Sequence, residues 1–292
     1  RPAVADGAPI PLWPEGTDLA KPDTGDGPEV TGKGSSPVGG RDWHWVGDVS
    51  QPTMTLYHPR GRNTGTTMLV LPGGGFSIVA MDLEGSEICD WAVRQGMTCV
   101  VLKYRAPQKW PWDERRKHGR RPEVLLALQD AQRAMGLLRE RAGIYGINPD
   151  RIGVIGFSAG AYLAADVSNI EGRTYPPVDA ADRRPSRPAF AIMAYTGRLW
   201  AGGSSSDLGL APWVKISPRA PPTLLIHAMD DPVDDIRHPM AYALALHEAG
   251  APVDVRFYAK GGHAYGMRPT ADPVTTQWPG QAEQWLRDLG LL

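Results

Sequence analysis

The sequence predicts an α/β fold in which a mostly parallel central sheet carries helices on both faces. Two observations support this class. Short apolar runs alternate with helix-period segments along the chain, which is the pattern of a parallel sheet with crossover helices. Hydrophobic residues make up 42% and charged residues 22% of the 292 residues, as in ordinary globular proteins, and this length suits a single domain with a sizeable core.

The expected elements follow one another from residue 53 to the end of the chain. We expect an edge strand at Thr53–Tyr57, a buried strand at Thr66–Leu71, and further strands at Thr98–Lys103, Arg151–Ile155, Phe190–Ala194, Pro222–His227 and Val253–Tyr258. Helices are expected at Leu83–Gln95, Glu123–Gly143, from Ala159 onward, Pro239–Ala249 and Gln281–Leu289. Crossovers in such a fold are right-handed, and ligands bind beyond the carboxyl ends of the strands.

The first part of the chain has a different character. Residues 1–40 are rich in Pro, Gly, Asp and Ser and show no apolar period, so we expect an irregular N-terminal arm that wraps the surface. Residues 41–292 are expected to form a single catalytic domain, and no segment has the size of a large cap domain.

Charge and composition restrict the partners. Lys and Arg number 31 against 32 Asp and Glu, and this net charge of -1 gives no general attraction for nucleic acid or anionic lipid. No apolar run approaches the roughly 18 residues that span a bilayer. Cys89 and Cys99 are expected to be unpaired, buried thiols. The chain opens at Arg1 without a signal stretch, as in a mature or trimmed form, and no feature specifies an oligomeric state.

Ser158 stands in the stretch Gly156-Phe157-Ser158-Ala159-Gly160, between an expected strand and an expected helix. In this setting a serine sits on a tight turn with its hydroxyl pointing out of the sheet, and flanking glycines remove Cβ atoms that would clash. The pattern predicts Ser158 as a nucleophile. The alternative is a glycine-rich turn that only packs tightly.

A second glycine-rich stretch, Leu71-Pro72-Gly73-Gly74-Gly75-Phe76, follows the strand expected at Thr66–Leu71. Glycines let backbone N–H groups approach a substrate carbonyl oxygen closely, so we expect a donor at Gly74 or Gly75 to pair with the Ala159 amide as an oxyanion hole. The alternatives are an ordinary turn or a phosphate-binding loop, but no Gly-Lys-Ser/Thr follows.

A serine hydroxyl needs a base, and the base needs an orienting carboxylate. Asp231 follows a predicted strand and is the leading acid, with Asp230 and Asp234 as alternatives. His263 lies in a glycine-rich loop after the strand that ends at Tyr258 and is the expected base. In α/β sheets whose nucleophilic serine lies on a strand–turn–helix elbow, the acid and then the histidine follow the serine along the chain, as they do here. A solvated loop histidine is the alternative interpretation of His263.

The other histidines fit the role of base less well. His227 ends a strand but precedes the carboxylates, so we expect it to be buried and structural. A metal site built from the aspartates with His227 or His238 matches no standard ligand spacing, so neither a metal nor another cofactor is expected. The remaining histidines lie in a helix, in the N-terminal segment or away from strand ends: His44, His58, His118 and His247.

With these residues in place, the chain resembles the secreted branch of the α/β-hydrolases that comprises acetyl-xylan-esterase-like and acetylesterase-like carboxylesterases. The resembling stretches are Pro9–Pro14, Pro72–Phe76, Asp82–Gly85, Leu102–Arg105, Gln129–Ala134, Gly156–Gly160, His227–Val233 and Gly261–Gly266. The resemblance implies an α/β-hydrolase fold without a large cap domain and a secreted or periplasmic location. It also implies a catalytic triad and an oxyanion hole made of Ser158, Asp231, His263, Gly74, Gly75 and Ala159.

The chain departs from this family at two places. Relatives usually show His-Gly-x-x-Asp-x-x-Val around the acid, whereas this chain has Ala228 in place of Gly and Asp234 in place of Val. Relatives often carry a second Gly or a His after the elbow, where Ala161 and Tyr162 stand here.

Candidate substrate-binding residues lie outside the triad motifs. A basic loop between Arg105 and Glu123 contains Trp110 and Trp112, whose rings could stack on a sugar or an aromatic group above Ser158. The alternative is a solvated loop with both rings tucked onto the body. Glu84 and Tyr195 are further candidates for the pocket wall, with purely structural roles as the alternative.

These residues predict a serine carboxylic-ester hydrolase that works through an acyl-enzyme and removes acetyl groups from xylan-type carbohydrate or cleaves other short-chain esters. Its partner is then a small-molecule or oligosaccharide ester. The alternatives are a feruloyl or glucuronoyl esterase, a serine peptidase of the same fold, and an inactive, carbohydrate-binding protein with a hydrolase fold.

Overall fold

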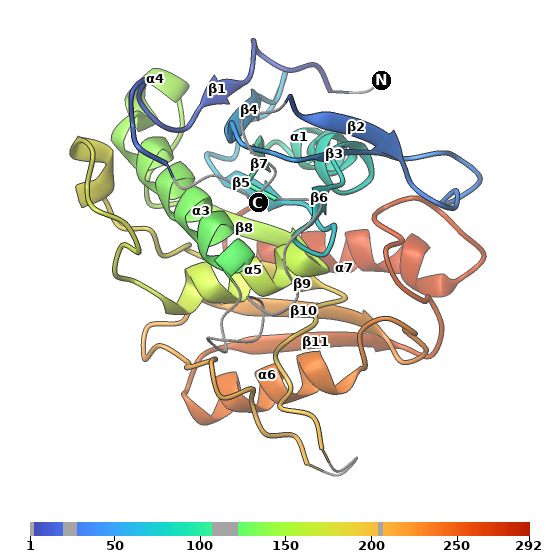
Figure 1. Ribbon diagram of the computed structural model, residues 1–292. Helices are drawn as coiled ribbons and strands as arrows, with labels where there is room; N and C mark the ends of the chain where they lie inside the picture. Colours follow the sequence, from blue (N-terminus) through green and yellow to red (C-terminus); the bar gives the residue numbers. More distant parts are fainter. Residues whose placement is uncertain (1–2, 20–27, 107–121, 204–206) are drawn as a thin grey trace.

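The computed structural model describes residues 3–19, 28–106, 122–203 and 207–292. Within them, one eight-stranded sheet runs through the molecule in the order β1-β4-β7-β5-β8-β9-β10-β11 (Figure 1). Its strands are β1 (Ile10–Pro11), β4 (Thr53–Tyr57), β5 (Thr67–Leu71), β7 (Thr98–Lys103), β8 (Ile152–Phe157), β9 (Ala191–Ala194), β10 (Thr223–Ala228) and β11 (Val253–Tyr258).

From β7 to β11 neighbouring strands pair in parallel, and only β1 and β4 at one side run antiparallel to their neighbours. The predicted mostly parallel sheet is therefore confirmed. The central strands β5, β8, β9 and β10 are buried along their whole length because helices cover both of their faces.

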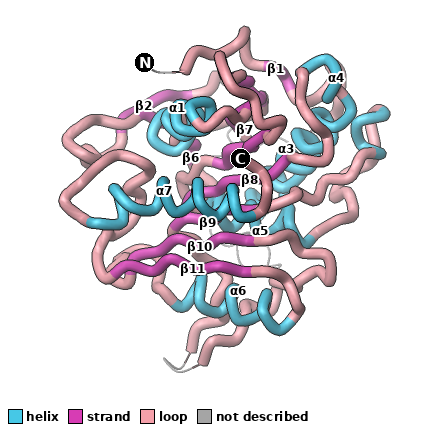
Figure 2. Tube along the Cα trace, turned by 180° about the vertical axis from the view of Figure 1, so that it is seen from behind, coloured by secondary structure: helices cyan, strands magenta, loops and turns pink. Residues whose placement is uncertain are grey.

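The helices are η1 (Asp82–Ser86), α1 (Glu87–Arg94), α3 (Pro122–Glu140), α4 (Ala142–Tyr145), α5 (Ala159–Asn169), η2 (Ala180–Arg183), α6 (Arg237–Glu248) and α7 (Pro273–Asp288). Helices α3, α5 and α6 pack on one face of the sheet, and α1 and α7 pack on the other, which Figure 2 shows from behind. Alternate residues of one strand enter the two cores: Val154 of β8 faces the first and Ile155 the second.

Three elements differ from the sequence expectation. The strand at Thr53–Tyr57 is not the outermost one, because the short β1 pairs along its free side. The helix expected from Leu83 begins as the separate turn η1. Helix α7 begins at Pro273, well before the expected Gln281, although Pro279 lies inside it. Burial of Val274 and Trp278 in the core outweighs the helix-breaking tendency of that proline.

The N-terminal arm is more regular than its composition indicates. It contains β1 and β2 (Val30–Lys33), and β2 joins β3 (His44–Gly47) and β6 (Ile78–Val79) in a second, three-stranded sheet. The expectation of an irregular arm is therefore wrong at β1 and β2. Backbone pairing between strands supplies the order that the Pro- and Gly-rich sequence lacks.

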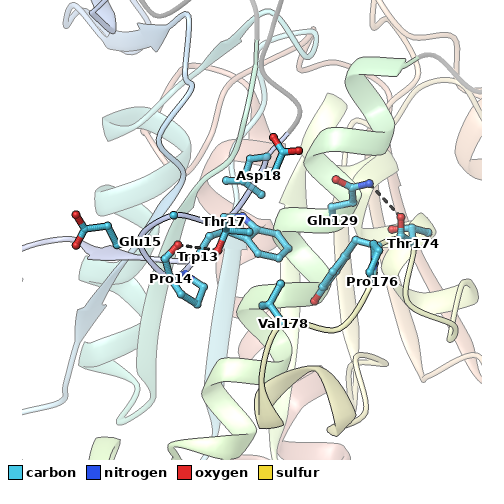
Figure 3. A pocket seen from close by; sticks show the side chains of 12 residues that line it. Trp13, Pro14, Glu15, Thr17, Asp18, Gln129, Thr174, Pro176 and Val178 are labelled. Carbon is cyan, nitrogen blue, oxygen red and sulfur yellow. Dashed lines mark hydrogen bonds between the residues drawn. The ribbon is translucent and has the colours of Figure 1, made fainter.

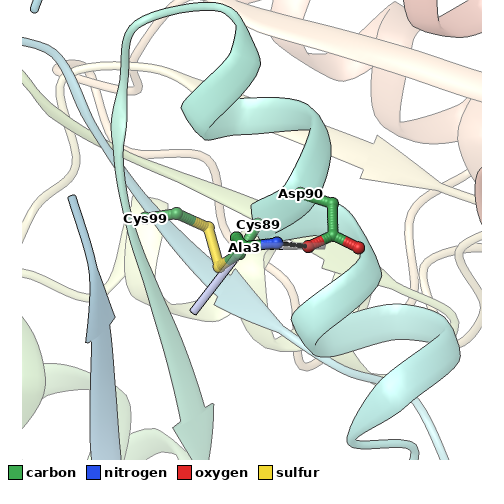
Figure 4. Close-up of a disulfide and its surroundings, with 4 residues drawn as sticks. All are labelled: Ala3, Cys89, Asp90 and Cys99. Atoms are coloured by element: carbon green, nitrogen blue, oxygen red, sulfur yellow. Dashed lines mark hydrogen bonds between the residues drawn. A yellow bond between two sulfur atoms is a disulfide. The ribbon is translucent and has the colours of Figure 1, made fainter. Parts of the chain in front are cut away.

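The expectation of unpaired cysteines is also wrong. Cys89 of α1 and Cys99 of β7 form a disulfide across 5.3 Å between their Cα atoms (Figure 4). Both are fully buried, and the bond fastens α1 to the sheet. The sequence contains both cysteines but does not reveal that the helix lays one beside the other. None of the described helices combines the length and the apolar character that a membrane crossing requires.

Candidate active site

Ser158 lies on the turn that joins β8 to α5 and has a positive φ of 54°. A Cβ atom added to Gly156 would lie 2.1 Å from the carbonyl oxygen of Gly160, and one added to Gly160 would lie 1.9 Å from the carbonyl oxygen of Leu71. Only glycine therefore fits on either side of this turn. The turn presents the serine hydroxyl at the carboxyl edge of the sheet, as the sequence predicts.

His263 reaches Ser158 from the loop that follows β11. Its Nε2 lies 2.9 Å from Ser158 Oγ, within hydrogen-bond distance, although the two residues are 105 positions apart. The imidazole is largely buried, with 13% of its side chain exposed. The nitrogen facing the serine can therefore accept its proton in a site that is mostly shielded from water.

Asp231 completes a continuous chain of contacts from the loop after β10. Its Oδ2 lies 2.8 Å from Nδ1 of His263, and its Oδ1 accepts hydrogen bonds from the amides of Val233 and Asp234. The carboxyl group is fully buried. These contacts orient the imidazole, which is the task of the acid in a catalytic triad.

The two alternative acids lie elsewhere around the same ring. Asp230 Oδ1 accepts hydrogen bonds from the amides of Gly261 and Gly262, so it holds the histidine loop rather than the imidazole. Asp234 approaches the opposite nitrogen, with its Oδ2 at 3.9 Å from His263 Nε2. Among the three aspartates, geometry gives the Nδ1 contact to Asp231.

The glycine-rich loop lies beside the elbow. Among the described residues, the amides of Gly74, Gly75 and Ala159 donate to no protein acceptor. Ala159 is the first residue of α5, where N–H groups lack partners within the helix and the helix dipole favours negative charge. These amides are suited to hold a developing oxyanion. The far end of the loop is anchored because β6 pairs with β3 of the small sheet.

A buried wall supports the glycine-rich loop from behind. Glu84 Oε1 accepts a hydrogen bond from the Gly73 amide at 3.0 Å, and its Oε2 accepts one from the hydroxyl of Tyr195. The hydroxyl of Tyr104 donates to the carbonyl oxygen of Pro72. Glu84 and Tyr195 are 3% and 0% exposed, so they lie beneath the triad and not on an open pocket wall.

Burial controls ionisation in this wall. It raises the pKa of the Glu84 carboxyl above its usual range, and the hydrogen bonds from Tyr195 and Gly73 only partly oppose the rise. Burial and the nearby Glu84 charge raise the pKa of Tyr195 well above its ordinary value. The phenol of Tyr195 therefore stays protonated and remains a donor.

The pKa of His263 depends on the carboxylates around it. Burial disfavours the imidazolium of His263, but the hydrogen bond and charge of Asp231 and the charges of Asp234 and Glu84 outweigh it and raise the pKa of His263. His227, in contrast, has a pKa lowered by burial. Its expected buried position is confirmed, since it is 0% exposed, and its Nε2 donates to the carbonyl oxygen of Asp234.

Trp110 and Trp112 fall outside the described residues. A separate hollow of about 570 Å³ lies between the N-terminal arm and α3, with Trp13 and Gln129 on its walls (Figure 3). The Trp13 ring is packed against the guanidinium groups of Arg105 and Arg133, so its faces serve the core.

The sequence carries only weak signals for two charged groups near the triad. The loop after β9 brings the Arg198 guanidinium over the Phe76 ring at 4.9 Å, and no motif marks that residue. Asp234 has a signal, because the resemblance to acetyl-xylan-esterase-like proteins leads us to expect Val at this position. That signal does not reveal which atom of His263 the carboxylate faces.

Comparisons with known proteins show sequence similarity to esterases. The chain is 26% identical over 259 residues to an acetylxylan esterase of Xylanibacter ruminicola, covering 84% of this chain and 48% of that protein. It is 26% identical over 214 residues to an ethyl acetate hydrolase of Pseudomonas putida, covering 65% of this chain and 63% of that protein. The chain thus spans about half the length of the first relative and less than two thirds of the second.

A solved structure matches nearly the whole fold. The acetyl ester-xyloside bifunctional hydrolase of Caldicellulosiruptor lactoaceticus superposes with a TM-score of 0.74 at 25% identity, covering 98% of this chain and 97% of that one. A family model for the alpha/beta hydrolase fold matches residues 68–267, more than half of the chain. The predicted fold class and the resemblance to acetylxylan-esterase-like proteins are confirmed, and the chain belongs to the α/β-hydrolase family.

Proposed function

We propose that this protein is a serine carboxylic-ester hydrolase that removes acetyl groups from carbohydrate. The observation that carries the proposal is the continuous chain from Ser158 Oγ through His263 to Asp231, with contacts of 2.9 and 2.8 Å. The amides of Gly74, Gly75 and Ala159, which donate to no acceptor among the described residues, lie at the same edge of the sheet. A nucleophile, a base, an orienting carboxylate and oxyanion donors are the groups that ester hydrolysis requires.

In this mechanism Ser158 Oγ attacks the carbonyl carbon of the ester while Nε2 of His263 accepts its proton. Asp231 stabilises the resulting imidazolium, and the amides of Gly74 or Gly75 and Ala159 hold the oxyanion. The imidazolium then returns the proton to the leaving alcohol, and an acyl-enzyme remains. Water, deprotonated by the same imidazole, attacks the acyl carbon and releases the acid and the free serine.

The substrate class rests on the relatives. One is named as an acetylxylan esterase, another as an ethyl acetate hydrolase, and the structural neighbour is described as acting on acetyl ester and xyloside. All three are consistent with a short acyl group. We therefore favour acetyl esters of xylan-type sugars over feruloyl or glucuronoyl esters, peptides and a non-catalytic binding role.

The Cys89–Cys99 disulfide supports an oxidising compartment, which is in keeping with a secreted or periplasmic protein. We further propose that residues 41–292 act as one catalytic unit onto which the N-terminal arm is packed.

The test is a hydrolysis panel with Ser158→Ala as the matched variant. The panel contains acetylated xylo-oligosaccharides, aryl esters of increasing acyl length, feruloyl esters, glucuronoyl esters and aminoacyl amides. We expect acetyl esters to react fastest and Ser158→Ala to lower kcat by about 10⁴- to 10⁶-fold. A fluorophosphonate probe is expected to label the wild type and not the variant. Full turnover by Ser158→Ala, or a preference for amides, would refute the proposal.

A further inference from the structure

We infer that the carboxylate of Asp234 receives a hydroxyl group of the substrate's alcohol and so selects esters of neutral vicinal diols, such as partly acetylated sugars. The inference rests on the proposed esterase function of Ser158. It adds a specificity-determining residue on the leaving-group side of the site. The argument depends on where Asp234 is held, which atom it faces and which polar groups surround it.

The backbone of Asp234 is fixed by the acid loop itself. Its amide donates to Asp231 Oδ1 at 2.9 Å, and its carbonyl oxygen accepts from Nε2 of the buried His227 at 2.8 Å. The same carboxyl group that orients the imidazole therefore also sets the position of residue 234. A side chain at this position has a defined place relative to the imidazole.

The loop after β9 leaves room for the carboxylate. A Cβ atom added to Gly197 would lie 2.2 Å from Asp234 Oδ1, so the carboxylate occupies space that only glycine leaves open. The Asp234 side chain nevertheless keeps 21% of its surface exposed. It is thus packed on one side and accessible on the other.

Asp234 also keeps its capacity to accept hydrogen bonds. Among the described residues, no N–H or O–H group donates to its carboxylate, and its contact with His263 Nε2 at 3.9 Å is an ion-pair distance rather than a hydrogen bond. The charged groups that act on it are His263, Asp231, His227 and Arg198. An acceptor is therefore available beside the nitrogen that takes part in proton transfer.

The chemistry of the leaving group connects this acceptor to the substrate. To receive its proton, the alcohol oxygen of the ester must come within about 3 Å of Nε2. A hydroxyl on the adjacent carbon of a diol then comes near a carboxylate that lies 3.9 Å from the same nitrogen. A carboxylate accepts a hydrogen bond from a hydroxyl, and it repels an alcohol that itself carries a carboxylate.

The test compares two acetates of similar size, 2-hydroxyethyl acetate and propyl acetate, in which a hydroxyl replaces a methyl group. We expect wild-type kcat/KM to favour the hydroxyl compound. Replacing the acceptor in Asp234→Val is expected to lower this preference by about 10- to 100-fold, the usual effect of losing a hydrogen bond to a charged group. Asp234→Asn keeps an acceptor oxygen, so it should lose less.

The matched control is Asp235→Asn. This neighbour carries the same charge in the same loop, but its carboxylate pairs with Arg237 at 2.9 Å. We expect the control to keep the wild-type ratio. A measurement on the wild type alone adds 2-methoxyethyl acetate, which has the oxygen but cannot donate and should react like propyl acetate.

An unchanged ratio in Asp234→Val would overturn the inference. So would an equal loss on both acetates, because Asp234 would then act on the triad and not on the alcohol. If Asp234→Val does not fold, the ratio in Asp234→Asn and the methoxy comparison decide the question. Failure of the proposed function is distinguishable, because fluorophosphonate labelling of Ser158 would then be absent from the wild type itself.

Discussion

The two sides of the triad differ in whether their polar groups have hydrogen-bond partners within the protein. Behind it, Glu84, Tyr195 and Tyr104 are buried and satisfy one another or the glycine-rich loop. In front of it, the loop amides and the Asp234 carboxylate lack donors or acceptors among the described residues. Polar groups whose hydrogen bonds are all made within the protein hold the site in one geometry, whereas partly exposed groups with free hydrogen-bonding capacity can bind a ligand. The back of the site and the oxyanion amides should therefore govern the rate on every ester, and the Asp234 carboxylate should govern the choice among esters.

Among the groups on the two sides of the triad, the largest effect is expected from removing the negative charge of Asp231 behind the imidazole. Asp231→Asn leaves the shape of the loop but loses the group that stabilises imidazolium, so kcat should fall about 10⁴-fold on all esters. The matched control is Asp230→Asn, which keeps an acceptor oxygen for the amides of Gly261 and Gly262 and should lose no more than about fivefold. Equal losses in the two variants would contradict the assignment of Asp231.

A smaller uniform effect is expected from the wall beneath the loop. Glu84→Ala removes the acceptor of the Gly73 amide and of the Tyr195 hydroxyl, leaving two buried donors unpaired. We expect kcat to fall about 5- to 100-fold with KM little changed, on 2-hydroxyethyl acetate and propyl acetate alike. Glu248→Gln, on the exposed end of α6, serves as control. A fall in kcat on only one of the two acetates would contradict the expectation that residues behind the triad affect all esters equally.

The pH dependence of kcat/KM tests the position of the Asp234 carboxylate in front of the triad, with a smaller expected effect. The proposed mechanism requires neutral His263. Burial opposes its imidazolium, but Asp231 and then Asp234 outweigh that effect and raise the pKa of His263. The acid limb of kcat/KM should therefore lie above the ordinary histidine value of about 6.5. Asp234→Asn removes a negative charge, lowers this pKa and moves the limb to lower pH. A shift to higher pH, or an equal shift in Asp235→Asn, would count against the geometry.

The smallest effect on activity is expected from removing the Cys89–Cys99 disulfide, which lies on neither side of the triad. Cys89→Ser with Cys99→Ser frees α1 from β7, and we expect a loss of about 2–3 kcal/mol in the free energy of unfolding with kcat unchanged. Thermal melting with and without reductant measures the change, and reduced wild type should match the double variant. A large fall in kcat at a temperature where the variant is folded would show that the disulfide also positions the site.

The parallel sheet and the residues that meet at its carboxyl edge could be predicted because their signals are local. The strand expected at Arg151–Ile155, the glycines around Ser158 and the order of Asp231 and His263 can be recognised directly along the chain. Each of these signals comes from residues that are close together in the sequence, because it depends on the space or the chemistry that neighbouring residues provide. The contacts that join Ser158, His263 and Asp231 then follow from the sheet, which brings the ends of β8, β10 and β11 to one edge.

The features that sequence reasoning missed depend on segments far apart in the chain. The order in the N-terminal arm comes from pairing of β1 with β4 and of β2 with β3. The Cys89–Cys99 bond depends on how α1 packs on β7. The start of α7 depends on burial of Trp278, whose Nε1 donates to the carbonyl oxygen of Gly266. Tertiary packing overrides local preference in all of these cases.

The way in which Asp231 holds residue 234 bears on how such a site can diversify. Its Oδ1 binds the backbone amide of residue 234 and makes no demand on the side chain there. Codons for aspartate and valine differ by a single base. An Asp234→Val change would thus replace a polar acceptor by an apolar side chain beside His263 in one mutational step, while the hydrogen bond from the amide of residue 234 to Asp231 is kept.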